Sequence, residues 1–200
     1  MTPDVLQNRL KAMLAAVLVA MAIIVAGLLL GGPKAALPDI AVPVVTRIGP
    51  APENNQAARD HAGLIEQGRY HAAFAVGDGA AYGWSDNYAT ADMADAAALA
   101  WCRDAGENCR IVTRIAPATD MTHEGQALSW TTALALWDFG HKPAPKALAL
   151  STTGAWGMSW NQPGGDMAAQ VALRNCQSRI DLTNKPGGLP AGSCRVLWVR

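Results

Sequence analysis

Two five-residue segments of the chain combine glycine, serine and asparagine in a pattern related to nucleophilic catalysis. They read Gly83-Trp84-Ser85-Asp86-Asn87 and Gly157-Met158-Ser159-Trp160-Asn161. A nucleophile elbow requires Gly-x-Ser-x-Gly on a strand-to-helix turn, together with a histidine and an acid. Asparagine replaces the last glycine in both segments, so we expect the serines and asparagines to hydrogen-bond the loop backbone. We predict no catalytic residue, and a serine hydrolase is the least favoured function.

Other groups capable of chemistry give weaker signals. His61, beside Asp60, and His71 lie ten residues apart without further ligands in a metal-binding spacing. Asp92 and Asp166 each open an alanine-rich run, where a carboxylate in the first helical turn complements the helix dipole. We therefore expect neither a metal nor a cofactor.

An internal repeat provides the framework for these residues. The segment 73–102 aligns without a gap with 147–176, and twelve of the thirty aligned positions are identical. The similarity resumes at Cys109 and Cys194, each of which opens an apolar run. A feature that occurs twice is easier to explain as scaffold than as a unique active site.

Each copy predicts the same order of elements. Two short apolar runs flank a turn rich in glycine, serine and threonine, which is typical of a β-hairpin. An alanine-rich helix follows, at about 91–103 and 165–175, and a last strand closes each unit at 109–114 and 194–199. Small residues recur every four positions along each helix, which allows close packing on a sheet. The expected fold class is α+β, with two tandem β-β-α-β repeat units.

The four cysteines are expected to form one disulfide in each copy. An even number of cysteines in an exported chain favours disulfides, and four cysteines allow three pairings. The repeat selects Cys102–Cys109 and Cys176–Cys194, each of which joins a helix end to a strand start. A zinc site would require CxxC-type spacing, which is absent.

The N-terminal region carries a candidate membrane anchor. Residues 13–32 contain no charge and are rich in leucine, valine, alanine and isoleucine. About 20 apolar residues can cross a bilayer as a helix. Arg9 and Lys11 precede the run, so the positive-inside rule predicts a cytoplasmic N-terminus and a periplasmic C-terminal domain at a bacterial inner membrane. A cleaved signal peptide is the alternative, but its apolar core is usually shorter.

The remaining segments connect these parts. The five prolines at 33–52 predict an extended tether, or a segment that lies against a partner. A short helix is expected at 57–67, with Asn55 as its N-cap and Gly68 as its end, and the stretch 122–139 has helical composition, with a strand as the alternative. The predicted organisation is a cytoplasmic tail at 1–12, a transmembrane helix at 13–32, a tether at 33–56, and repeat units at 57–118 and 119–200, each with a leading helix.

These residues resemble the bacterial domain of unknown function 4189 family. The resemblance rests on Ala147-Leu148-Ala149, Gly154-Ala155-Trp156-Gly157-Met158-Ser159, Ala172-Leu173-Arg174-Asn175-Cys176 and Cys194-Arg195-Val196. The first copy matches more loosely, with one additional residue between its first glycine and the aromatic residue. The resemblance covers about half of the chain. It implies small exported domains with a disulfide, and it implies no activity.

Charge and aromatic content narrow the class of partner. Residues 33–200 carry 14 basic and 15 acidic side chains, and this balance argues against nucleic acid. The first copy is acidic and the second is basic, which predicts either mutual attraction or simple divergence. The chain has seven tryptophans but two phenylalanines. We expect Trp156 and Trp198 in the core, whereas Trp84 and Trp160 suit either the core or an interface.

The sequence therefore favours a non-enzymatic interaction protein. The expected role is an accessory subunit of a larger inner-membrane complex, with the lipid bilayer and an integral membrane protein complex as partners. The alternative is a periplasmic module that binds a glycan or a peptide through Trp84 and Trp160.

Overall fold

The computed structural model describes residues 40–182 and 192–200, which belong to one compact unit, Pro38–Arg200. No helix within these described ranges has the length and apolar character needed to cross a membrane. The expected transmembrane helix at 13–32 lies outside them. The described residues form α-helices and antiparallel sheets, as expected for an α+β fold.

The first lobe, residues 40–117, contains a four-stranded antiparallel sheet. Its elements are β1 (Pro43–Arg47), α2 (Asn55–Gln67), β2 (Ala72–Val76), β3 (Tyr82–Ser85), α3 (Ala91–Ala105) and β4 (Arg110–Pro117), and the strand order is β1-β4-β2-β3. Helix α2 begins after the N-cap Asn54, whose side chain accepts from the backbone N–H groups of Gln56 and Ala57. It ends at Gly68, which adopts the left-handed conformation that glycine tolerates.

The second lobe, residues 130–200, repeats the order helix, strand, strand, helix, strand. Its elements are α4 (Trp130–His141), β7 (Ala147–Ser151), β8 (Trp156–Ser159), α5 (Gly165–Leu182) and β9 (Cys194–Val199), and its sheet has the order β8-β7-β9. The hairpin registers correspond: Ala73 pairs with Ser85, and Ala147 pairs with Ser159. Strands β2 and β7 also have a register shift at corresponding places in their pairings with β4 and β9.

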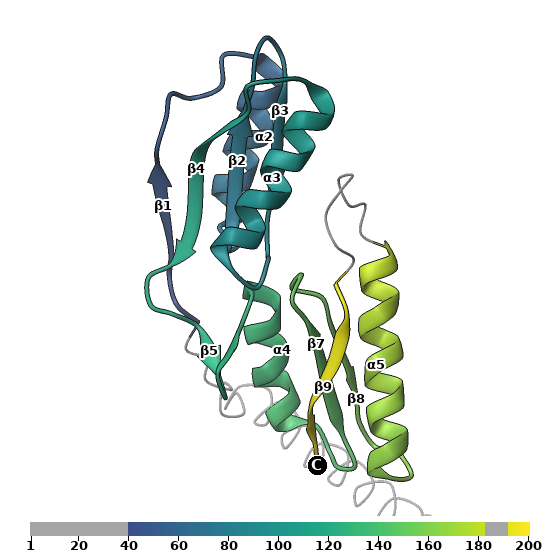
Figure 1. Cartoon of the computed structure of the whole chain (residues 1–200). Coiled ribbons are helices and arrows are strands. Elements are labelled where there is room, and N and C mark those ends of the chain that lie inside the picture. Colours follow the sequence, from purple (N-terminus) through teal and green to yellow (C-terminus); the bar gives the residue numbers. More distant parts are fainter. Residues whose placement is uncertain (1–39, 183–191) are drawn as a thin grey trace, which may run out of the picture. The chain divides into compact units, whose positions relative to one another are not determined.

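Each sheet is covered by two helices, one on each face. In the first lobe, Leu64 of α2 packs with Phe74 on one face, and Ala98 of α3 packs with Ala75 on the other. In the second lobe, Phe139 of α4 and the alanine stripe of α5 cover the two faces in the same way. Figure 1 shows α4 and α5 on opposite sides of the β7–β9 sheet. The stripe of small residues predicted along α3 and α5 is therefore the surface that lies against the sheet.

Part of the predicted tether is instead a strand. Pro43–Arg47 form β1, which pairs antiparallel with β4, with Val45 opposite Ile115. The prediction of an extended tether over 33–56 is wrong for this segment. Proline is compatible with this position because β1 lies at the edge of its sheet and Pro43 is its first residue. Residues 33–39 lie outside the described ranges.

The helix predicted over 122–139 is present only from Trp130 onward, and the alternative prediction of a strand holds for part of 122–127. Thr122–His123 form β5 and Gln126–Ala127 form β6, a two-stranded hairpin that precedes α4. Glu124 and Gly125 both have positive φ angles, which is the geometry of a tight two-residue hairpin turn. Helix α4 starts after Ser129, whose hydroxyl accepts from the backbone N–H of Thr132 at 3.3 Å. Helix α5 also extends beyond its expected end at Asn175, to Leu182.

Candidate functional site

A cleft of about 910 Å³ lies between the two lobes. One wall is β3 and the loop that follows it to Tyr88, and the other is the β7–β8 turn with Trp156 and Arg179. The lining includes five aromatic side chains: Tyr82, Trp84, Tyr88, Trp101 and Trp156. Pockets of this volume, with aromatic walls and a few polar groups, are typical of ligand-binding sites.

The two lobes are in direct contact beside the cleft. Asn87 accepts from the backbone N–H of Thr131 at 2.8 Å and donates to its Oγ1 at 2.8 Å, so it caps the first turn of α4 from the other lobe. The carbonyl of Tyr70 accepts from the N–H of Trp130 at 3.3 Å, and the two rings meet edge to face. A side chain at Gly154 would overlap the Asn87 carbonyl. The backbones of the two lobes are therefore in contact at this point.

One ring of the aromatic wall is held by neighbouring side chains, and another is exposed. Tyr82 stacks on Phe74 with ring centroids 5.7 Å apart, and its hydroxyl donates to Asp60 at 2.7 Å. This hydrogen bond, together with burial, raises the pKa of Tyr82. Trp84 comes from the same strand but keeps 40 % of its surface exposed. Its ring is therefore available to a ligand.

The charges in the cleft are not balanced. Arg69 pairs with Asp86 at 3.2 Å. Arg179 lies over the ring of Trp156, 3.6 Å from its centroid, and it forms no ion pair among the described residues. Burial lowers the pKa of Arg179. The cleft thus holds one guanidinium whose charge is met by an aromatic face rather than by a carboxylate.

No family model matches the chain, and no curated protein or solved structure matches it either. The resemblance to the domain of unknown function 4189 family stays a prediction.

The two tryptophans proposed as interaction residues lie in different surroundings. Trp84 lines the cleft, whereas Trp160 does not. Trp160 is 45 % exposed, and the ammonium group of Lys142 lies 4.9 Å from its ring centroid. Trp198 is buried as expected, but Trp156 is only partly buried because its ring faces the cleft.

The serines of the two Gly-x-Ser segments join strand to helix. Ser85 Oγ donates to the carbonyl of Ala94 at 2.6 Å, and Ser159 Oγ donates to Ala168 at the same distance. Both are buried. A nucleophilic serine donates its proton to a general base, and a helix carbonyl cannot act as one. We expected the hydroxyls to bond the loop, but they bond the helix instead.

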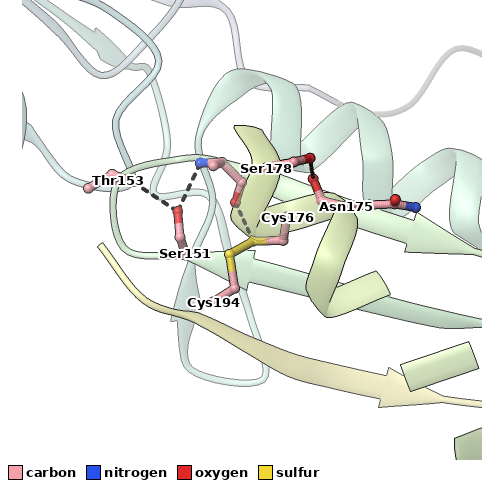
Figure 2. Close-up of a disulfide and its surroundings, with 7 residues drawn as sticks. Ser151, Thr153, Asn175, Cys176, Ser178 and Cys194 are labelled. Atoms are coloured by element: carbon pink, nitrogen blue, oxygen red, sulfur yellow. Dashed lines mark hydrogen bonds between the residues drawn. A yellow bond between two sulfur atoms is a disulfide. The ribbon is translucent and has the colours of Figure 1, made fainter. Parts of the chain in front are cut away.

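The predicted disulfides are both present. Cys102 pairs with Cys109 and Cys176 pairs with Cys194, each with Cα atoms 6.0 Å apart. Figure 2 shows the second disulfide beside the β7–β8 turn, where Ser151 Oγ contacts Thr153 Oγ1 at 3.0 Å. Since this turn is one wall of the cleft, the disulfide lies next to the site.

His61, Asp92 and Asp166, which were named from the sequence, lie in the scaffold, whereas the buried Nδ1 of His71 has no hydrogen-bond partner among the described residues. His61 is buried, and its Nε2 lies 2.7 Å from Thr113 Oγ1. Asp92 and Asp166 lie in the first turns of α3 and α5, as predicted. No group of side chains suited to hold a metal ion occurs in the part of the chain that the structure describes.

Acidification is expected to destabilise the protein through His61. Burial, assisted by the charge of Arg47, lowers the pKa of His61 from its ordinary value of 6.5. The unfolded chain then binds a proton that the folded protein rejects. The free energy of unfolding therefore falls as pH drops through about 6.5, and it continues to fall until the lower folded pKa is reached. We expect His61→Gln to flatten this dependence between about pH 6.5 and pH 5 in urea unfolding series.

The control for this prediction is the wild-type protein, unfolded in urea over the same pH series. A residual slope in His61→Gln is expected, because burial also lowers the pKa of His71. An identical slope in His61→Gln and the wild type would contradict the prediction.

Two residues of the site, Asn87 and Arg179, were not identified from the sequence. Asn87 is identical to Asn161 in the aligned copies, and this identity favoured a role in the scaffold; its contact with Thr131 is specific to the first lobe. Arg179 carried no signal, because nothing in its local sequence relates it to β3. Only the packing of the lobes brings these groups to one cleft.

Proposed function

We propose that this protein is a non-enzymatic binding module whose ligand occupies the cleft between the lobes. The observation that carries the proposal is the aromatic lining around the exposed ring of Trp84. Large aromatic surfaces supply much of the free energy of binding at recognition sites. The guanidinium of Arg179 adds one polar group that can orient a ligand.

The proposal also covers where the protein is located and how its two lobes are related. The apolar run at 13–32 is interpreted as a single membrane helix, with the N-terminus in the cytoplasm and the domain in the periplasm of a bacterial inner membrane. Two disulfides suit an oxidising compartment. The two lobes are interpreted as tandem copies of one unit, related to the domain of unknown function 4189 family.

Replacement of Trp84 by alanine is the direct test. The purified full-length chain in mild detergent is screened against muropeptides, oligosaccharides and peptide pools, and retained compounds are measured by titration calorimetry. Loss of one stacking ring is expected to weaken binding by about tenfold or more. Trp160→Ala is a matched control, since Trp160 is similarly exposed but lies outside the cleft.

Circular dichroism of Trp84→Ala must show an intact fold for the comparison to count. Equal loss of binding in Trp84→Ala and Trp160→Ala would contradict the cleft as the binding site. Failure of all three compound classes to bind the wild-type protein would contradict the proposed function.

A second proposed role, as an accessory subunit of a larger inner-membrane complex, is supported by the position of β1. If 13–32 crosses the bilayer, residues 33–42 alone connect the membrane to Pro43. Ten extended residues span at most about 35 Å. The domain would then stay close to the membrane surface, within reach of an integral membrane partner. We expect co-migration with a larger assembly after mild detergent extraction, and recovery as a lone small species would contradict this role.

A further inference from the structure

We propose that the ligand of the cleft is an extended acidic peptide that adds as a strand to the free edge of β3. This inference rests on the proposed function and specifies the chemical class of its ligand. In this mode, main-chain hydrogen bonds provide affinity, and side chains on alternate residues provide specificity.

The edge of β3 is open on the side away from β2. Strand β3 is the last strand of its sheet and pairs with β2 alone among the described strands. Along an antiparallel strand, residues that hydrogen-bond the partner strand alternate with residues whose main-chain groups point away from it. The N–H of Gly77 donates to the carbonyl of Ala81 at 2.8 Å, so Ala81 belongs to the first kind. By this alternation Gly83 and Ser85 direct their main-chain groups toward β2. Tyr82 and Trp84 direct theirs outward, where no described residue bonds them.

This open edge coincides with the cleft. All four residues of β3 line it, and Gly83 can do so only with main-chain atoms because it has no side chain. Unused edge strands are commonly protected by proline, by charged side chains or by a covering segment. The opposite edge of the same sheet begins with Pro43 and ends with Arg47. Strand β3 contains neither proline nor a charged residue, so it lacks these protections.

The rings of the wall define which peptide side chains fit. Tyr82 and Trp84 are two residues apart on one strand and therefore project to the same face of the sheet. An added strand would place alternate side chains on that face, next to these rings. Apolar or aromatic residues at every second position are expected there.

Charge complementarity specifies the acidic group. Arg69 is already paired with Asp86, whereas Arg179 faces the ring of Trp156 without an ion pair in the described part of the chain. A peptide carboxylate near Arg179 would gain a charge-assisted hydrogen bond and leave the stacking on Trp156 intact. The peptide therefore carries an aspartate, a glutamate or its C-terminal carboxylate on the side facing the second lobe.

A glycan would also stack on aromatic rings. The free row of main-chain donors and acceptors on β3 favours a peptide, because another extended main chain matches its spacing. The distinction between the two ligand classes is made by experiment.

The test begins with a selection. A displayed library of random twelve-residue peptides is panned on the full-length chain in mild detergent, with Trp84→Ala for counter-selection, and enriched peptides are synthesised. Each is then prepared with N-methyl groups on alternate main-chain nitrogens, in the two possible phases. One phase is expected to weaken binding by at least about tenfold and the other to have little effect, because alternate N–H groups of an added strand face β3.

Variants of α5 test the acidic group. Arg179→Gln is expected to lower the affinity for enriched acidic peptides by about tenfold. When the peptide carboxylate is replaced by an amide, Arg179→Gln and the wild type should bind the peptide equally. Arg174→Gln is the matched control, because Arg174 is exposed on the same helix but lies outside the cleft. Circular dichroism confirms that both variants are folded.

Three results would overturn the inference: no enrichment over the counter-selection, equal effects of the two N-methyl phases, or equal effects of Arg179→Gln and Arg174→Gln. If muropeptides or oligosaccharides bind in a way that depends on Trp84, and peptides do not bind, the proposal of a peptide ligand is wrong. The proposed function as a binding module would still hold. Absence of both kinds of binding would overturn the proposed function as well.

Discussion

Gly83→Ala and Gly157→Ala are each expected to lower the free energy of unfolding by about 3 kcal/mol. The two glycines occupy corresponding positions on β3 and β8. A Cβ at Gly83 would lie within 3.0 Å of the Ala98 carbonyl and the Cys102 nitrogen, and a Cβ at Gly157 would meet Ala172 and Cys176 in the same way. Real Cβ atoms do not approach backbone atoms this closely, so the helix must move off the sheet.

This cost is large because a helix backbone cannot adapt as a flexible side chain can. Displacement of α3 would also separate Ala98 from Ala75 and disturb the bond from Ser85 to Ala94. The whole interface between helix and sheet is therefore affected by one methyl group. The same argument applies to α5 on its sheet.

Gly63→Ala is the matched control. Gly63 lies inside α2, and a Cβ there would have no neighbour within 4 Å. Alanine is expected to stabilise this helical position by about 0.5–1 kcal/mol, because it loses less conformational entropy on folding. Urea unfolding of the full-length variants, followed by circular dichroism, measures all three changes. A Gly83→Ala variant as stable as the wild type would contradict the close approach of α3.

Removal of the second disulfide is expected to cost more than removal of the first. The Cys176–Cys194 pair closes a loop with a sequence separation of 18, against 7 for Cys102–Cys109. The chain-entropy relation then gives a loss of about 3 kcal/mol for Cys176→Ala/Cys194→Ala and about 2 kcal/mol for Cys102→Ala/Cys109→Ala. Urea unfolding of the two double variants under oxidising conditions measures the difference.

The second disulfide is also expected to affect the cleft. Cys176 Sγ lies 3.7 Å from the carbonyl oxygen of Ala155, which belongs to the turn that forms one wall. Without the disulfide, hydrogen–deuterium exchange in residues 151–155 should increase while exchange in β2 stays unchanged. Reductant applied to the wild type should reproduce the combined loss of stability. A larger loss in the Cys102→Ala/Cys109→Ala variant would contradict the loop-length argument.

The disulfides, most strands and the small-residue faces of the helices could be predicted from the sequence. Each depends on a pattern within a short window, and the internal repeat provides that pattern twice. Cys102 and Cys176 align between the two segments, so the sequence predicted one disulfide within each segment, and both disulfides are present. Glycine occurs at both position 83 and position 157 because a helix backbone lies too close to each of them for a Cβ atom.

The segments that were predicted wrongly depend on distant partners. Val44 and Val45 lie in a proline-rich stretch whose composition favours an extended tether. They pair instead with Ala116 and Ile115, about seventy residues further along the chain. The turn at Glu124-Gly125 divides a stretch whose composition alone favours a helix. Local composition cannot reveal a hydrogen-bonding partner that is remote in sequence.

The sequence by itself indicated an α+β fold and, in each of its two aligned segments, a hairpin, an alanine-rich helix and a disulfide. The tertiary structure alone decided that Trp84 lies in a cleft and Trp160 does not, and that Arg179 faces that cleft. The physical reason is that both decisions follow from the packing of one lobe on the other. That packing rests on contacts such as Asn87 with Thr131, between residues that are unrelated in the aligned copies.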